Sequence, residues 1–254
     1  MTSQINLIVD DTVEELPPLP PCDLYSDEPP METDLHLKQM MLLISCLNWL
    51  WRDRQDFFVA GNLTIYYSQK RIKTRDFRGP DFFVVQGVEP RSRKSWTIWE
   101  EDGKYPDLIV EILSESTAEV DRTTKKTLYQ NTFRTPEYFW FDPETLEFVG
   151  FSLNRGHYQP IQPNQQGLLW NDQLQLFLGV HENKLRFFQL DGQLVATPEE
   201  SALAEQQQRL IAAGRAELAE ERAELAEERA ELAEERAERL AARLRSLDID
   251  PNSL

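Results

Sequence analysis

Residues 108–113 read LIVEIL, an apolar run that is interrupted by a single carboxylate, Glu111. A short, nearly continuous apolar run is typical of a strand that is buried on both faces, as parallel strands are in α/β proteins. Side chains alternate along a strand, so Glu111 shares a face with Ile109 and Leu113. An ionised carboxylate there is unfavourable unless it has a partner. We expect a lysine, a metal ion or a hydrogen-bond network opposite Glu111, although a structural salt bridge or a strand edge near solvent would also account for it.

Helix and strand patterns surround this strand. A first helix is predicted from Thr33 or Asp34 to about Arg54, and a second from Ser114, Ser116 or Thr117 to about Phe133. The apolar positions that place the first helix against a core are Leu37, Met40, Met41, Ile44, Leu47 and Trp51. Further strands are predicted at 57–59, 63–67, 82–85, 138–141, 146–153, 157–162, 174–178 and 185–190. This order favours an α/β or α+β fold, with helices packed on a mixed sheet.

The two ends of the chain differ in composition from the middle. Residues 1–31 are predicted to be a disordered, acidic, proline-rich arm that contains LPPLPPC, and residues 32–195 to be the folded domain. Residues 196–254 are predicted to be a charged helical tail, because RAELAEE occurs three times, beginning at Arg215, Arg222 and Arg229. Its seam is formed either by leucines that alternate with arginines or by a thinner row of alanines, so we expect weak self-association rather than a strong coiled coil.

Charge and motif content restrict the function. The formal net charge is −17, which disfavours nucleic acid as a partner, but residues 70–94 hold eight basic and three acidic residues, a local charge of +5. An ordinary solvated loop would explain this run equally well. The chain contains no phosphate-binding GxxxxGK[ST], no GxSxG and no HExxH. It has two cysteines and no apolar run of about 20 residues, so we expect a cytoplasmic protein without a membrane partner.

Two further charged positions accompany Glu111. Asp81 opens the predicted strand PDFFVV, and Lys125 lies in the predicted second helix. Asp121, Lys125 and Tyr129 follow one another at four-residue steps and therefore share one side of that helix. A helix that returns across the sheet could direct Lys125 toward the strands that carry Asp81 and Glu111. The simpler alternative is a solvated ladder on the helix surface.

The segments PDFFVV, PDLIVEILSEST, DRTTKKTLYQ and TPEYFWFDPET, in this order, resemble the Uma-two family of restriction-endonuclease-like proteins over residues 31–195. That family belongs to the PD-(D/E)xK nuclease superfamily, which implies a four-stranded mixed sheet flanked by helices. The resemblance implies that Asp81 and Glu111 are metal ligands. The usual lysine position is occupied by Leu113, so Lys125 is the implied replacement.

Other positions match the family less well. Asp107 also follows a proline but fits the motif only locally, and Glu32 and His36 lie in the opening helix, where a role for either is a weak expectation. The lone His36 would more often be a structural residue. The heptad repeats lie outside the resemblance.

The resemblance implies a metal-dependent endonuclease that hydrolyses phosphodiester bonds, with DNA as the favoured partner and Mg²⁺ or Mn²⁺ as cofactor. In this view the Ile112 carbonyl adds a metal ligand, Lys125 orients water or neutralises the transition state, and Tyr129 holds Lys125 or packs in the core. The residues expected to contact the nucleic-acid backbone are Arg71, Lys73, Arg75 and Arg78. A homo-oligomer formed through the nuclease domain or the tail is a further expectation.

Two alternatives remain at this point. The first is a catalytically degenerate nuclease fold that acts as a binding or scaffold protein through its helical tail. The second is a glycosidase, which would need two carboxyl groups across an open cleft and sugar-stacking aromatics such as Trp96, Trp99 and Trp140.

Overall fold

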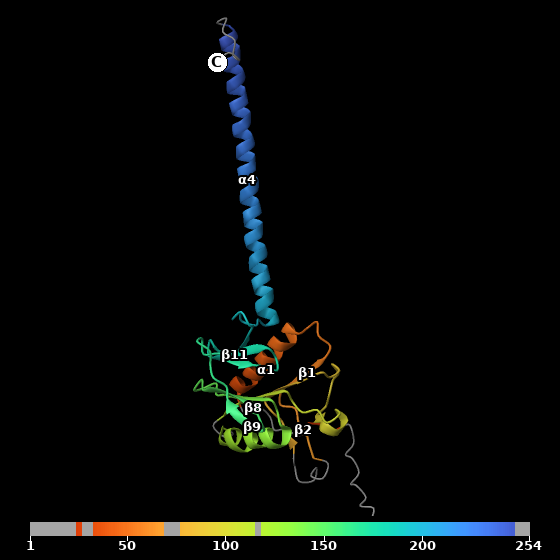
Figure 1. The fold of residues 1–254 in the computed structure, drawn as a ribbon. Coiled ribbons are helices and arrows are strands. Elements are labelled where there is room, and N and C mark those ends of the chain that lie inside the picture. Colours follow the sequence, from red (N-terminus) through yellow and green to blue (C-terminus); the bar gives the residue numbers. More distant parts are fainter. Residues whose placement is uncertain (1–23, 27–32, 69–76, 115–117, 247–254) are drawn as a thin grey trace, which may run out of the picture. The chain divides into compact units, whose positions relative to one another are not determined.

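The computed structural model describes residues 24–26, 33–68, 77–114 and 118–246. The chain divides into two compact units, residues 1–197 and residues 198–254. The first unit contains a mixed sheet with helices on both faces (Figure 1). The second contains the helix α4, Pro198–Arg245. The fold class is therefore the mixed α/β class that the sequence predicts, with the long C-terminal helix in addition.

The main sheet has six strands in the order β1-β4-β6-β7-β8-β9. Their bounds are β1 Phe57–Ala60, β4 Phe82–Gln86, β6 Leu108–Ile112, β7 Glu137–Phe141, β8 Phe148–Asn154 and β9 His157–Pro160. Only the central pair, β6 and β7, runs parallel; the other neighbours are antiparallel. The sheet is thus wider than the four strands implied by the resemblance, because β1 and β9 extend its edges.

Two small sheets accompany the main one. The strands β10 Leu169–Asn171, β11 Leu176–His181 and β12 Lys184–Phe188 form an antiparallel meander. The strand β2 Ile65–Tyr66 pairs with β3 Phe77–Arg78 and, in parallel, with β5 Trp96–Thr97, which the short helix η2 Ile98–Glu100 follows. β1 and β2 therefore do not form a hairpin around Gly61-Asn62, since β1 pairs with β4 instead.

The helix α1, Asp34–Leu50, begins where the sequence predicts, with the Thr33 side chain accepting a hydrogen bond from the His36 amide. It ends before Arg54. Its buried face also differs from the predicted one: Leu37 and Met41 are exposed, whereas His36 and Gln39 are buried. Gln39 can be buried because its amide donates to and accepts from the backbone of Leu185 in β12.

The second helical segment crosses between β6 and β7, as a parallel pair requires. It consists of α2 Ala118–Val120, η3 Asp121–Lys125, α3 Lys126–Leu128 and η4 Tyr129–Phe133. The segments η3 and η4 are π-helical, whereas the sequence predicted a regular helix. The Ala118 amide donates to the Ser114 carbonyl, while the other two predicted caps, Ser116 and Thr117, lie outside the described residues. We refer to residues 118–133 as the crossover helix.

Apolar clusters cover both faces of β6, as its composition predicts. Leu108 and Val110 belong to one cluster, with α1 and the β10–β12 meander. Ile109 and Leu113 belong to the other, with Tyr129 and Phe133 of the crossover helix. The helix α1 and the crossover helix thus lie on opposite faces of the sheet (Figure 1). Within the described ranges, no helix is both long and apolar enough to cross a membrane.

Candidate active site

Asp81 and Glu111 face each other across two neighbouring strands. The pairing of Phe82 with Val110, continued by one residue, places Asp81 opposite Glu111. The Asp81 amide donates to Glu111 Oε2 at 3.3 Å, and the Ile112 amide donates to Asp81 Oδ2 at 2.8 Å. The strand register therefore fixes both carboxylates at the same end of the two strands.

The crossover helix brings three more polar groups to this end of the strands. Lys125 Nζ lies 3.1 Å from Glu111 Oε2 and 2.7 Å from Asp121 Oδ1. The Tyr129 hydroxyl donates to Glu111 Oε1 at 2.7 Å. The three side chains share one side of the helix, and that side faces the sheet rather than solvent. Leu113, at the usual lysine position of the motif, is buried in the apolar cluster on this face.

His36, for which a role was only a weak expectation from the sequence, lies beside Asp81. Its Nε2 lies 2.9 Å from Asp81 Oδ1, and its side chain is only 7% exposed. The contact arises because the buried face of α1 runs through positions 36, 40, 43 and 47, at helical spacing. That spacing could have identified His36 as inward-facing. We call His36, Asp81, Glu111, Asp121, Lys125 and Tyr129 the carboxylate–lysine cluster.

Burial and neighbouring charges shift the pKa values of the cluster in different directions. Burial raises the pKa of Glu111 well above its ordinary value, although the Lys125 ammonium opposes the shift. Burial alone would raise the pKa of Asp81 as well, but the hydrogen bond with His36 and the Lys125 charge hold it below its usual value. Burial lowers the pKa of Lys125, but Glu111, Asp121 and Asp81 outweigh that effect and raise it. Lys125 is therefore a cation at neutral pH.

The cluster suits a divalent cation. Three buried carboxyl groups, Asp81, Glu111 and Asp121, share the cluster with Lys125, which pairs with the last two, so carboxyl groups outnumber the lysine. The oxygen atoms of Asp81 and Glu111 lie at the same end of neighbouring strands, and carboxylate oxygens are the ligands that Mg²⁺ and Mn²⁺ prefer. Within the described residues, no group of three or more histidine, cysteine, aspartate or glutamate side chains already has the geometry of a metal site.

The predicted backbone-contacting residues fall mostly outside what can be described. Arg71, Lys73 and Arg75 lie outside the described residues, whereas Arg78 is half-buried on β3, three residues before Asp81. Elsewhere in the basic run, Arg91 and Arg93 both pair with Glu101. Arg93 also lies over the Phe58 and Trp96 rings and is only 2% exposed. Part of the basic run therefore stabilises the fold rather than presenting charge to solvent.

Asp107 lies at the opposite end of the β4–β6 pair from the carboxylate–lysine cluster. Its Oδ2 accepts a hydrogen bond from the Gln86 amide at 2.7 Å. Burial raises its pKa. This carboxyl group closes the strand pair, which fits the weaker match of Asp107 to the motif.

Two of the three aromatics considered for sugar stacking are poorly placed for it. Trp96 is fully buried and donates its indole hydrogen to the Lys104 carbonyl, and Trp140 is 7% exposed. Neither of these rings can form a platform at an open cleft, and Trp99 is the remaining, half-buried candidate, so support for the glycosidase alternative is weakened.

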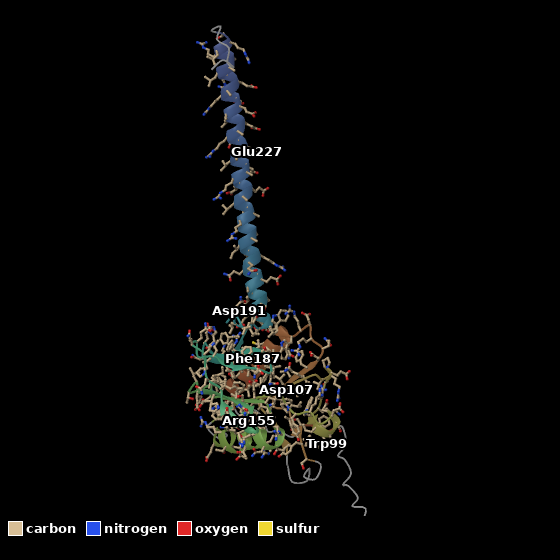
Figure 2. All side chains as sticks on the ribbon, in the orientation of Figure 1. Trp99, Asp107, Arg155, Phe187, Asp191 and Glu227 are labelled. Carbon is tan, nitrogen blue, oxygen red and sulfur yellow. The ribbon has the colours of Figure 1, made fainter. Side chains whose placement is uncertain are left out.

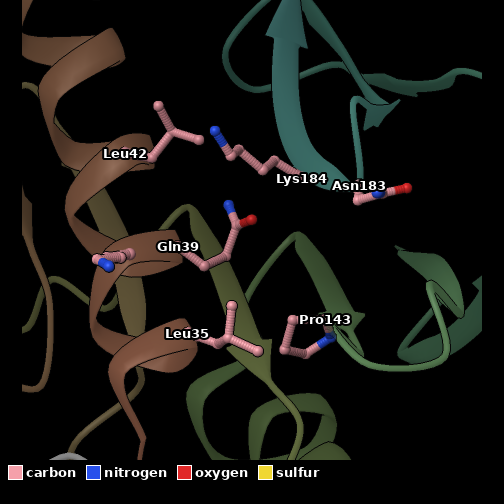
Figure 3. A pocket seen from close by; sticks show the side chains of 7 residues that line it. Leu35, Gln39, Leu42, Pro143, Asn183 and Lys184 are labelled. Atoms are coloured by element: carbon pink, nitrogen blue, oxygen red, sulfur yellow. The ribbon is translucent and has the colours of Figure 1, made fainter.

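A separate cavity of about 250 Å³ lies beside α1 (Figure 3). Its other walls are the turn after β7 and the turn between β11 and β12. Leu35, Leu42 and Pro143 line it, together with Lys38 and Lys184. None of the cluster residues lines this cavity. The candidate active site therefore lies at the end of β4 and β6 and is separate from this cavity.

Comparison with known proteins identifies the family of this chain. The profile of the Uma2 family, described as "Putative restriction endonuclease", matches residues 24–181, which is more than half of the chain. A solved structure described as a "putative nuclease belonging to DUF820", from Anabaena variabilis, is 16% identical, with a TM-score of 0.39. That match covers 54% of this chain and 75% of the other. No curated protein matches the chain.

Proposed function

Because the chain belongs to the Uma2 family, we propose that it is a metal-dependent endonuclease that hydrolyses phosphodiester bonds in cytoplasmic DNA. The observation that supports this most is the carboxylate–lysine cluster. Lys125 reaches Glu111 from a different element, and Asp81 faces Glu111 on the neighbouring strand. Charged groups that are buried together lower the stability of the fold unless they are well paired. Such groups cluster at functional sites.

Asp81 and Glu111 are the proposed ligands of one or two Mg²⁺ or Mn²⁺ ions. When bound, the cation supplies positive charge beside the scissile phosphate and makes a water molecule more acidic. The Ile112 amide donates a hydrogen bond to Asp81 Oδ2, and the other oxygen, Oδ1, faces His36. His36, which contacts that same oxygen, holds the carboxylate in orientation.

Lys125 acts as a cation in this proposal and not as a base. Its raised pKa keeps the ammonium group protonated, so it can donate hydrogen bonds to the attacking water or to a non-bridging phosphate oxygen. Asp121 and Tyr129 position the cluster: Asp121 holds the Lys125 ammonium at 2.7 Å, and Tyr129 holds Glu111. Arg71, Lys73, Arg75 and Arg78 are proposed to contact the flanking phosphates, which gives no base specificity.

The test is cleavage of supercoiled plasmid, single-stranded DNA and RNA in the presence of Mg²⁺ or Mn²⁺. We expect cutting of plasmid DNA by the wild-type chain, and a loss of about 10²-fold or more with Glu111→Ala or Lys125→Ala. The matched control is Lys126→Ala, since Lys126 is the next residue but lies over the Phe151 ring instead of in the cluster. It should retain activity.

Calorimetric titration with the same metal ions separates the outcomes. Metal binding that is lost in Asp81→Asn and Glu111→Ala, with unchanged circular dichroism, supports the site. If no substrate is cut and no metal binds, the nuclease proposal fails. The degenerate fold acting as a scaffold through α4 would then be the better interpretation.

A further inference from the structure

The helix α4 carries apolar and charged side chains along its whole length. It runs for 48 residues, about 72 Å, and none of its residues is buried. Its side chains project on all sides, as at Glu227 in Figure 2. Leu218, Leu225 and Leu232 are 55%, 52% and 47% exposed, at seven-residue intervals. A long helix of this kind gains most of its stability from packing against a partner.

The charges of α4 are arranged unfavourably for a single helix. Residues three and four positions apart are the neighbours on a helix surface. Those neighbours of Arg222 and Arg229 are all alanine or leucine, whereas those of Glu220 and Glu227 are alanine or glutamate. In the described part of α4, neither Arg222 nor Arg229 forms an ion pair. The i,i+4 pairs are Glu205–Arg209, before the repeats, and Glu235–Arg239, which begins at the last residue of the third copy.

The alanines define a continuous seam. They recur at alternating steps of four and three residues from Ala212 to Ala237, and Leu240 and Leu244 continue the same spacing. This is the a/d pattern of a heptad repeat, with Ala219 and Ala226 at d and Ala223 at a. We call this the alanine seam.

The charges that flank the alanine seam are complementary between two parallel copies. In this register every g position from Arg215 to Arg243 is arginine, and the e positions 220, 227 and 234 are glutamate. In a parallel pair, each g residue faces the e residue of the following heptad on the other helix. Arg222 would then face Glu227 of the second copy, and Arg229 would face Glu234.

Other arrangements are disfavoured by the same charges. In an antiparallel pair, g faces g and e faces e, so arginine would meet arginine and glutamate would meet glutamate. A seam built on Leu218, Leu225 and Leu232 would bury arginine at the alternate core position, which costs desolvation. It would also place alanine at e, opposite the glutamates at g, and so form no ion pairs there.

We propose that the occupant of the alanine seam is α4 of a second copy of this chain, in parallel and in register. Each helix thereby supplies the countercharges that the other lacks along its own surface. The association is independent of the nuclease activity proposed above.

The test is the mass of the full-length chain by sedimentation equilibrium over a concentration series. We expect the wild-type chain to dimerise. Arg222→Glu with Arg229→Glu, and separately Glu227→Arg with Glu234→Arg, should each weaken association by about tenfold or more, because like charges then meet at every altered pair. An equimolar mixture of the two variants should associate again. The control is Glu221→Arg with Glu228→Arg, which makes the same charge change at the solvated f positions and should leave dimerisation intact.

Disulfide formation distinguishes the two seams. In a Cys22→Ser background, with Cys46 buried, Ala226→Cys should cross-link two copies faster than Leu225→Cys does. The proposal is overturned by a single-chain mass at every concentration, by a mixture of the two charge variants that stays monomeric, or by faster cross-linking at position 225. Circular dichroism checks that each variant keeps its helix content.

Discussion

Glu111 places a carboxyl group at a strand position that has no solvent exposure, and three neighbouring groups contact its oxygens. Tyr129 and Lys125 bind its two oxygens, and the Asp81 amide shares one of them. Burial nevertheless raises its pKa, so the hydrogen bonds do not fully replace water. The residue is therefore kept at a cost in folding free energy, as active-site groups commonly are.

Glu111→Gln should raise the free energy of unfolding by about 1 kcal/mol at pH 8 without metal, while it abolishes cleavage. A glutamate with a raised folded-state pKa stabilises the fold at low pH, and that contribution is lost as the pH rises through the folded pKa. Glutamine cannot ionise, so the advantage of the variant should grow from pH 5 to pH 8.

Urea denaturation of the two proteins at both pH values measures this difference. Glu144→Gln, at an exposed position, should show no difference at either pH. A Glu111→Gln protein that is less stable than wild type at pH 8 would mean that the ion pair with Lys125 outweighs the cost of burial.

At the scale of elements, the site depends on how β6, β7 and the crossover helix are joined. The sequence predicted these three elements, apart from the π-helical turns of the crossover helix, because each has a strong local signal: two apolar runs and one amphipathic segment. It did not predict that β1 pairs with β4, or that β10 exists, because non-local pairing leaves little trace in a short segment. The burial of His36 was not predicted for a related reason, since the face of α1 was assigned from its apolar residues alone.

Close packing of β7 and β8 gives a prediction at this scale. Gly150 lies opposite Phe139, and an added Cβ would clash with the Phe139 ring and approach Leu169 to 3.1 Å. Gly150→Ala should therefore lower the free energy of unfolding by about 1–3 kcal/mol, measured by urea denaturation. Gly214→Ala is the matched control, because a Cβ there meets nothing within 4 Å and should raise the helix content of α4. Equal stability of Gly150→Ala and wild type would show that the ring can move aside.

At the scale of the whole molecule, the two units depend on different interactions. The first holds both apolar clusters and the carboxylate–lysine cluster, whereas α4 has no buried residue. The last buried residue before α4 that joins a cluster is Val195, whose amide donates to the Phe187 carbonyl and whose carbonyl accepts from Arg186.

Truncation after Thr197 should therefore leave the thermal midpoint of the sheet unit and its DNA cleavage close to those of the full chain. Truncation after Leu190 removes Val195 and should lower the free energy of unfolding by about 2 kcal/mol or more. Calorimetric melting of the two shortened chains beside the full chain makes the comparison. A shortened chain that ends at Thr197 but no longer melts cooperatively would show that the sheet unit needs α4.

The residues of the candidate site lie far apart along the chain, in part because the parallel pair β6 and β7 is joined by a crossover. Its residues are contributed by α1, by β4, by β6 and by the crossover helix, so their contacts join chain positions 14, 18, 31 and 45 residues apart. Contacts of such separation close large loops and form slowly compared with local turns. The candidate site is therefore complete only when α1, β4, β6 and the crossover helix are all in place.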